Sequence, residues 1–464
     1  MTASPLPPDL LAAAAAIGER RICLVVGAGC SKEAPTGLPL SWELSQQAHA
    51  QLVADGVLDA GECLQPEDLS AVADVVFAKK QSQRPLISRM RPERFRNARS
   101  NEGYRLAVAL MLEDVVRTIV TLNYDLAVEH AVSEVGAGDR ISTIKEASEW
   151  SRGSGRLVVF LHGNINSDPD SFILRSCQLN DDWKNGWEQV VAQAALAAPT
   201  CVFAGLGSPA PVLTSSVAWV RSVLTGDVYL ADPGDRERSA FATALGIDDE
   251  HFIKKGWNEF VGSLANRVLA EHARNLKEAA SAHAEANGLP PADLTTTCDG
   301  LARTGMVTLG SARAQWLRQE PGYARLSDET ANDLIADLLT ALAAVLHETG
   351  ASIRLSADGV VEFRNGAHVL GRLALASGLG ALSADALSSR VRRSLEASAT
   401  VDPLPSVVIL GATNSPLSAV SPPVDIAGDI DAKSVAYVSR EPVYLSLEDV
   451  RTNPTLVVNV WEAA

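Results

Sequence analysis

The feature that most constrains the fold of this chain is a short apolar run that recurs along its first half. Such runs occupy residues 21–26, 117–122, 156–161, 200–205 and 227–231. Their length and their β-branched content are typical of buried strands. Helical or loop patterns separate them, and strands that alternate with helical stretches form βαβ units with a parallel sheet. We therefore expect an α/β fold with a Rossmann-like parallel sheet.

The first run stops at Gly27-Ala28-Gly29, and Ser31 follows shortly afterwards. Glycines at such a turn let backbone amides approach a pyrophosphate without a clash with Cβ atoms, and the start of the following helix favours the anion. Lys32 stands where the third glycine of the dinucleotide-binding pattern G-x-G-x-x-G would lie. The turn alone leaves two interpretations open, a phosphate cradle and a tight strand-to-helix turn without a ligand.

The next two runs end at polar side chains. Asn123 and Asp125 follow the second run, and His162 follows the third. Ligands of open parallel sheets bind outside the carboxyl ends of the strands. The Asn-x-Asp sequence could therefore orient a ribose and a water, and the imidazole could act as a general base at neutral pH. The alternatives are an Asx turn that ends the strand and a histidine with a structural role.

The fourth run ends in a further small-residue sequence, Gly205-Leu206-Gly207-Ser208. Gly205 and Ser208 could form a wall of the same site that contacts a second phosphate or ribose, and the alternative is a simple turn. Together the four strand ends indicate a nucleotide pocket at one edge of a parallel sheet, with one Asn and one His placed to do chemistry.

The length of 464 residues is typical of two or three domains. We place the first domain at residues 1–285, with a helical insert at about 44–115, and the second domain at residues 290–464. The insert carries seven arginines, which form either a solvated helical face or a lid that faces phosphate. They are Arg84, Arg89, Arg91, Arg94, Arg96, Arg99 and Arg105.

The second domain is predicted to be of the α+β or α/β type. Residues 325–349 predict a long amphipathic helix, and Asn365-Gly366 between two strand-like runs predicts a β-hairpin. The remaining expected elements are a helix at 381–398, a strand at 406–410 and a terminal strand at 455–460. Asp358 and Glu362 on the hairpin could form a nuclease-like metal site, although a structural hairpin is the simpler interpretation.

Composition argues against several classes of function. The formal net charge of −16 at pH 7 repels phosphate backbones and disfavours non-specific nucleic-acid binding by the whole surface. The six cysteines include no CxxC pair, so we expect neither a zinc site nor a redox motif. No uncharged apolar run reaches ~18 residues, and the Ala-rich start lacks the basic residues of a signal peptide. We expect a cytoplasmic protein that does not interact with membranes.

Taken in order, the four strand ends resemble the sirtuin superfamily over about residues 18–275. The matching sequences are Gly-Ala-Gly-x-Ser at 27–31, Thr-x-Asn-x-Asp at 121–125, Leu-His-Gly at 161–163 and Gly-x-Gly-Ser at 205–208. The similarity is strongest to the bacterial sirtuin-like branch that hydrolyses NAD in antiphage defence. The sequence GAGCSKEAPTGLPLSWEL resembles the opening of that branch, with Trp42 where protein deacylases carry a Phe-Arg pair. The zinc module of the deacylases is absent, and the helical insert occupies its place.

The resemblance implies a role for each strand end. Asn123 would position the nicotinamide ribose or the attacking water, and His162 would be the base. Asp125 would lie at the nicotinamide end. The pyrophosphate of NAD would be held by Gly27, Ala28, Gly29 and Ser31, and the adenosine side would be contacted by Gly205 and Ser208. Many relatives carry Gly-x-Ser-x-x-Asp at this last position, where the present chain has Gly-Leu-Gly-Ser-Pro-Ala at 205–210.

The resemblance also implies an NAD glycohydrolase that releases nicotinamide and ADP-ribose, acts in antiphage defence and needs no metal. Related systems couple such domains to self-assembly, to a hexameric ATPase or to a nucleic-acid-guided protein, so we expect a homo-oligomer or a partner protein. Two other functions stay open, namely an NAD-dependent protein deacylase and a non-catalytic module that senses NAD or ADP-ribose. The missing zinc module counts against the deacylase, and the presence of Asn123 and His162 counts against the sensor.

Overall fold

The computed structural model describes residues 5–138, 140–150, 155–180, 186–209, 211–287, 299–301, 303–316, 328–357, 359–376, 407–411 and 443–462. The chain forms two compact units, Met1–Val268 and Leu269–Ala464. Helix α14 (Trp257–Asn287) runs through the boundary, so the first unit ends inside a helix. Within the described ranges, no helix combines the length and the apolar character needed to cross a membrane.

The first unit is built around a seven-stranded parallel sheet with the order β3-β4-β2-β1-β5-β6-β7. Its strands are β1 (Ile22–Val26), β2 (Val116–Thr121), β3 (Ile141–Ile144), β4 (Arg156–Phe160), β5 (Thr200–Ala204), β6 (Asp227–Ala231) and β7 (Phe252–Ile253). Every residue of β1 and β5 is buried, as expected for central strands covered on both faces. The predicted Rossmann-like parallel sheet is confirmed.

The strand order reverses beside β1. From β1 the chain moves to β2, β3 and β4 on one side, and then returns past β1 to β5 on the other side. Open parallel sheets bind ligands in the crevice at the carboxyl ends of the strands where the order reverses. The turns at residues 27–31 and 205–208 follow β1 and β5, so both lie at this point of the sheet.

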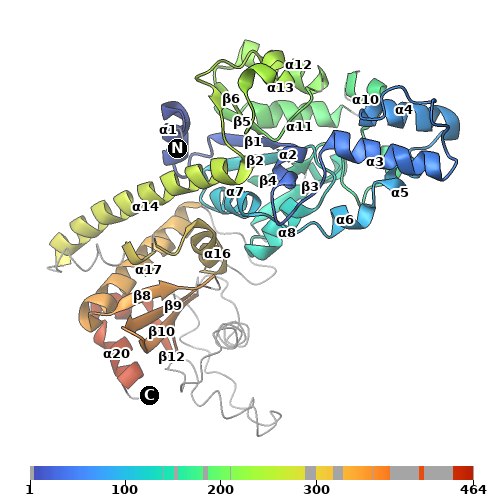
Figure 1. Ribbon diagram of the computed structural model, residues 1–464. Helices are drawn as coiled ribbons and strands as arrows, with labels where there is room; N and C mark the ends of the chain where they lie inside the picture. Colours follow the sequence, from blue (N-terminus) through green and yellow to red (C-terminus); the bar gives the residue numbers. More distant parts are fainter. Residues whose placement is uncertain are drawn as a thin grey trace, which may run out of the picture. The chain divides into compact units, whose positions relative to one another are not determined.

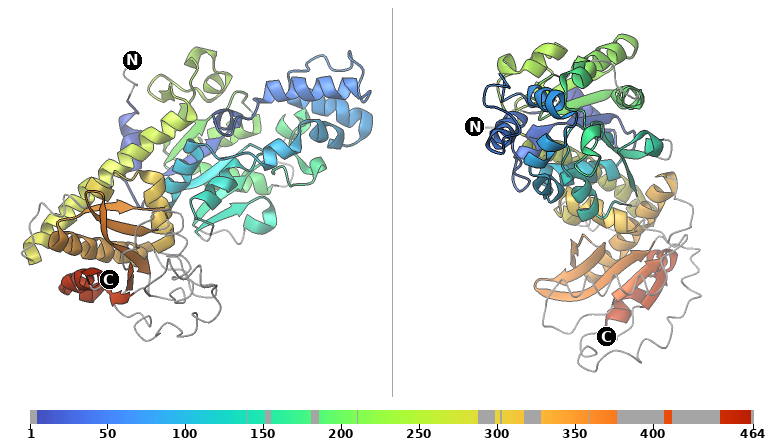
Figure 2. Two further views of the ribbon diagram at one scale, coloured as in Figure 1. Left: turned by 60° about the horizontal axis from the view of Figure 1, so that its bottom comes forward. Right: turned by 90° about the vertical axis from the view of Figure 1, so that its right-hand side faces the viewer.

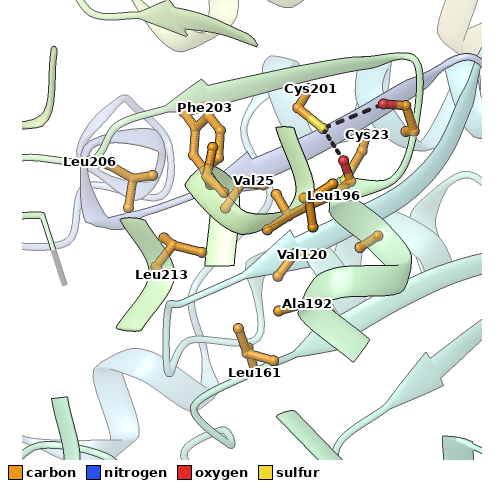
Figure 3. Packing of buried hydrophobic residues seen from close by; sticks show 14 of the residues in the cluster. Cys23, Val25, Val120, Leu161, Ala192, Leu196, Cys201, Phe203, Leu206 and Leu213 are labelled. Atoms are coloured by element: carbon orange, nitrogen blue, oxygen red, sulfur yellow. Dashed lines mark hydrogen bonds between the residues drawn. The ribbon is translucent and has the colours of Figure 1, made fainter. Parts of the chain in front are cut away.

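Helices cover both faces of the sheet, with α11, α12 and α13 on one side and α7 and α8 on the other (Figure 1). The first group packs on a buried apolar cluster, in which Cys23 and Val25 of β1 and Phe203 of β5 meet Leu196 and Leu213 (Figure 3). Besides α14, the described helices of the first unit outside the insert are α1 (Pro8–Ala15), α2 (Ala28–Lys32), α8 (Ala127–Glu134), α9 (Ala147–Trp150), α10 (Ser176–Asn180), α11 (Trp187–Leu196), α12 (Pro211–Val223) and α13 (Ala240–Leu245), with short 3-10 helices at Pro169–Ser171 and Arg236–Arg238.

The helical insert lies between β1 and β2. It consists of α3 (Ser41–Ala54), α4 (Leu69–Lys80), α5 (Arg84–Arg89), α6 (Pro92–Arg96) and α7 (Glu102–Leu112). Helices α3, α4 and α5 pack on one another and extend away from the sheet (Figure 2), whereas α7 returns to β2. Nine of the eleven residues of α7 are buried, namely Gly103, Tyr104 and every residue from 106 to 112, so this helix belongs to the core of the unit.

The second unit contains a five-stranded sheet with the order β12-β11-β10-β9-β8. Its strands are β8 (Ser352–Leu355), β9 (Val360–Asn365), β10 (His368–Ala376), β11 (Val407–Gly411) and β12 (Val443–Ser446). The strands β8, β9 and β10 pair antiparallel, and β10, β11 and β12 pair parallel. The hairpin predicted around Asn365-Gly366 is therefore confirmed.

The helices of the second unit are α16 (Met306–Trp316), α17 (Asp328–Thr349), α19 (Leu447–Thr452) and α20 (Thr455–Glu462). They share a core with the apolar side chains of the sheet. The predicted helix at 325–349 is confirmed by α17, whereas the predicted terminal strand at 455–460 is wrong. That segment is α20, because Val457 and Trp461, four residues apart, are buried together on one helical face. The predicted helix at 381–398 lies outside the described residues.

Candidate active site

The glycine turn after β1 lies in close contact with the loop after β5. The N–H of Gly27 donates to the carbonyl of Ala204 at 2.9 Å, and the N–H of Gly29 donates to the carbonyl of Gly205 at 2.8 Å. A Cβ on Gly29 would lie 2.7 Å from the Cα of Gly205, which itself has a φ of +65°. Glycine is therefore required here by the packing of two strand ends, and these two amides serve that contact. The N–H of Ala28, at the first position of α2, has no acceptor inside the helix.

Asn123 lies just beyond β2 and is 8% exposed. Its side-chain nitrogen donates to the carbonyl of Gly27 at 3.0 Å and lies 3.2 Å from both Ser31 Oγ and the hydroxyl of Tyr104. Because a backbone carbonyl can only accept, the contact with Gly27 fixes which end of the amide faces the glycine turn. The oxygen Oδ1 therefore points away from the turn. It receives no hydrogen bond from the described residues, so it can accept one from a ribose hydroxyl or a water.

Ser31, Asp125 and Tyr104 form the chain of hydrogen bonds that holds this amide. Ser31 Oγ donates to Asp125 Oδ2 at 2.8 Å, and it lies 2.9 Å from the Tyr104 hydroxyl. Ser31 has one proton, so it accepts from Tyr104, and Tyr104 accepts from Asn123. The other carboxylate oxygen of Asp125 accepts the N–H of Ala127 at 3.0 Å. Asp125 thus accepts a hydrogen bond from Ser31 with one oxygen and from Ala127, the first residue of helix α8, with the other.

Burial governs the titration of this cluster. It raises the pKa of the Asp125 carboxyl, while the hydrogen bonds from Ala127 and Ser31 oppose that shift. It also raises the pKa of the Tyr104 hydroxyl well above its ordinary value, so the phenol keeps its proton and remains a donor. The whole network therefore has a fixed direction at neutral pH, ending at the buried carboxyl group.

Tyr104 is the site residue that sequence reasoning missed. It lies in the first turn of α7, where Asn101 caps the helix by accepting the N–H of Tyr104 at 3.1 Å and donates to the carbonyl of Cys30 at 2.7 Å. The Tyr104 ring packs on Trp257, with 5.5 Å between ring centroids. Asn before an apolar helical run is a recognisable N-cap, but nothing in the sequence connects this helix start to the strand ends.

His162 lies beyond β4, the strand next to β2. The strands pair with Thr121 opposite Phe160, and their loops stay together, since Leu161 N–H donates to the Thr121 carbonyl at 3.1 Å. A second bond, from Ile165 N–H to the Tyr124 carbonyl at 2.8 Å, joins the loops further on. Residues 123 and 162 both fall between these two bonds, so they share one edge of the sheet.

His162 is buried and neutral. The residue is 8% exposed, and desolvation lowers the pKa of its imidazole to about 4. The imidazole is therefore uncharged at pH 7 and can accept a proton. Removal from water is the physical cause, because a buried imidazolium would lose its hydration.

Gly205 and Ser208 occupy different settings. Gly205 lies against Cys30 in the contact described above, where a Cβ would approach the Cys30 nitrogen to 2.4 Å. Ser208 is exposed, three residues further along the loop that leads to α12. The structure thus joins Gly27, Ser31, Asn123 and Asp125 in one hydrogen-bonded cluster, with His162 on the adjoining loop and Ser208 outside the cluster.

Two other features from the sequence belong elsewhere. Four insert arginines form ion pairs with acidic side chains, which favours a solvated helical face; they are Arg84, Arg89, Arg96 and Arg105. Glu362 faces Arg364 and Arg372 rather than a second carboxylate, and Asp358 lies outside the described residues. No group of three or more His, Cys, Asp or Glu side chains in the described ranges is placed to hold a metal ion.

Comparisons with known proteins give similarity in structure only. No family model and no curated protein sequence matches the chain. A Sir2 homologue bound to NAD is 17% identical, with a TM-score of 0.36, over 58% of this chain and 97% of that one. A mutant Sir2 homologue bound to ADP-ribose is 18% identical, with a TM-score of 0.34, over 57% and 96%. A Sir2 complex with a p53 peptide and NAD+ is 15% identical, with a TM-score of 0.30, over 57% and 95%. At these values the similarities assign neither family nor ligand to the chain.

Proposed function

We propose that the first unit is a sirtuin-like NAD glycohydrolase, which cleaves the bond between nicotinamide and ribose and releases ADP-ribose. The observation that carries the proposal is the pairing of Asn123 and His162 on adjoining loops beside the glycine turn, one with a free carboxamide oxygen and the other with a neutral imidazole. The order of motifs that resembles the sirtuin superfamily supports the same substrate.

The chemistry of the bond between nicotinamide and ribose determines which catalytic groups the protein must supply. Departure of nicotinamide leaves an oxocarbenium-like ribose, and nicotinamide departs as a neutral molecule because the pyridinium takes the bonding electron pair, so no general acid is needed. Oδ1 of Asn123 accepts a hydrogen bond from a ribose hydroxyl or from the attacking water. As the water oxygen bonds to the anomeric carbon, its proton passes to His162 and then to solvent. General-base help of this kind contributes typically ~10²–10⁴-fold, and positioning of the ribose and the water supplies much of the rest.

A single assay separates this proposal from its alternatives. Purified protein is incubated with NAD, with and without an acetyl-lysine peptide, over a range of protein concentrations, and nicotinamide and ADP-ribose are quantified. We expect equal amounts of both products without the peptide. Release of nicotinamide only in the presence of the peptide would instead indicate a deacylase. Tight binding of NAD with no product at any protein concentration, including those at which the chain assembles, would indicate a sensor.

We further propose that the second unit restrains this activity until assembly or a partner protein relieves it, as an effector of bacterial antiphage defence requires. Unrestrained NAD hydrolysis would deplete a cofactor that every cell needs, so such an enzyme has to be restrained until its activity is required. The second unit has its own sheet and its own core, which supports an independent role. Light scattering at increasing protein concentration, followed by the nicotinamide assay on each species, tests whether a homo-oligomer is the active form.

A further inference from the structure

One face of the second sheet carries arginines from three adjacent strands around one carboxylate. In the antiparallel register, Arg354 of β8 lies opposite Glu362 of β9, and Glu362 lies opposite Arg372 of β10. Residues directly opposite each other project from the same face of a sheet, as do residues two apart on one strand. Arg364 therefore shares this face with Glu362, and the face carries three guanidinium groups with one acidic group.

Glu362 accepts hydrogen bonds from only some of the N–H donors of these arginines. Its Oε1 accepts from Nε and Nη2 of Arg372 at 3.1 and 2.9 Å, and its Oε2 lies 3.6 Å from Nε of Arg364. Arg372 is 3% exposed, yet its Nη1 has no acceptor among the described residues, and neither has the buried Nε of Arg364. A buried guanidinium donor without an acceptor is unfavourable, so these two atoms call for an acceptor that the described residues do not supply.

A cavity of about 420 Å³ opens beside β8, at the edge of the same sheet. The residues around it include Gly300, Arg303, Thr304, Thr308, Ser352 and Arg354. Among the described residues, no acidic side chain lines this cavity, and neither Arg303 nor Arg354 forms an ion pair. This volume is typical of a binding site for a small molecule. Arg354 connects the two features, because it lines the cavity and belongs to the arginine face.

We propose that this cavity and the adjoining arginine face bind a small molecule that carries a diphosphate. A guanidinium presents two parallel N–H donors, which match the oxygens of a phosphate group. Neighbouring strands lie ~4.8 Å apart, so the backbones at Arg354 and Arg372 are separated by roughly 10 Å, a span that two linked phosphates cover better than one. The net charge of −16 repels anions from the molecule as a whole. Local arginines must therefore account for the binding.

Calorimetric titration of the full chain with pyrophosphate tests this site, with ADP as a second probe and inorganic phosphate as the single-phosphate comparison. We expect pyrophosphate and ADP to bind more tightly than phosphate. The exposed residues Arg303 and Arg354 give the informative variants, because Arg372 lies in the core. Arg354→Gln and Arg303→Gln should each weaken pyrophosphate binding roughly tenfold or more, as loss of a charged hydrogen bond does.

Arg94→Gln is the matched control, because it removes the same charge from an exposed arginine of the first unit. Its pyrophosphate affinity should equal that of the wild type. Unchanged affinity in the Arg303→Gln/Arg354→Gln double variant, or no binding of pyrophosphate and ADP to the wild type at millimolar concentration, would overturn the proposal. So would tight binding of a single-stranded oligonucleotide by a chain that binds neither probe. NAD cleavage is measured separately through nicotinamide release, so failure of this site and failure of the proposed function give different results.

Discussion

At the scale of single residues, the orientation of one amide decides what the site can do. Asn123 has its nitrogen committed to the carbonyl of Gly27, so only its oxygen can face a ligand. Around that nitrogen, the hydrogen-bonded residues Ser31, Tyr104 and Asp125 are all buried and come from three separate segments of the chain. A side chain held this way needs no rearrangement when substrate binds, which is the condition for efficient positioning.

Tyr104 is expected to act as a positioning residue. Tyr104→Phe removes the donor to Ser31 and an acceptor for Asn123, while the ring contact with Trp257 remains. We expect kcat for NAD cleavage to fall about tenfold, in line with the loss of a hydrogen bond worth ~1 kcal/mol or slightly more, with little change in KM. Tyr124→Phe is the control, because it deletes a hydroxyl that bonds the carbonyl of Ile173 instead. Equal kcat in both variants would remove Tyr104 from the site.

His162 should make stability depend on pH. Its pKa is depressed in the folded protein to about 4 from an ordinary 6.5, so the folded state binds fewer protons than the unfolded state. The stabilisation is fully present above pH 6.5 and is lost as the pH falls toward 4, by about 3 kcal/mol in total. Urea denaturation of the wild type and of His162→Gln between pH 7 and 4 measures this contribution. If both proteins lose stability equally over that range, the histidine is not buried as described.

At the scale of elements, the turns after β1 and β5 act as one unit. Gly205 has a left-handed φ of +65°, and a Cβ there would lie 2.4 Å from the backbone nitrogen of Cys30. We expect Gly205→Ala to lower stability by at least about 1–3 kcal/mol, through backbone strain and the steric clash, and to impair NAD binding. Gly207→Ala is the matched control, because a Cβ at that position meets nothing within 4 Å. Thermal denaturation of the two variants compares them directly.

Much of the first sheet follows from its sequence, and the exceptions have physical reasons. Strands β1, β2, β4, β5 and β6 lie within one residue of their predicted bounds, because central parallel strands are continuous apolar runs. The edge strands β3 and β7 have four and two residues, too few to give a pattern. The β-branched sequence at 455–460 favoured a strand locally, yet tertiary packing of Val457 and Trp461 makes it a helix.

The site was predictable only where its residues follow strands. Asn123 and His162 stand at the ends of apolar runs, so the topology of a parallel sheet brings them together. Tyr104 comes from a helix that returns from the insert, and no local pattern encodes that return. The sequence likewise indicates a phosphate cradle at Gly27 and Gly29, whereas the structure commits both amides to the loop after β5.

At the scale of the whole molecule, two separate cores should unfold separately. Phe203 lies in the core of the first unit and Phe363 in that of the second, and both are fully buried. We expect two calorimetric transitions. Phe203→Ala should shift one transition to lower temperature and Phe363→Ala the other. In each case the unit that carries the substitution should lose the ~3–5 kcal/mol of unfolding free energy typical of such truncations. A single transition that shifts equally in both variants would mean that the units fold as one.

Asn123 and His162 are proposed to act on NAD rather than merely to support the fold. The most direct measurement is nicotinamide release by Asn123→Ala and His162→Ala beside equilibrium binding of ADP-ribose, with His251→Ala, near the surface, as the control. We predict that both site variants bind ADP-ribose and stay folded, while their turnover falls by ~10²-fold or more. Wild-type turnover in either variant would contradict the account.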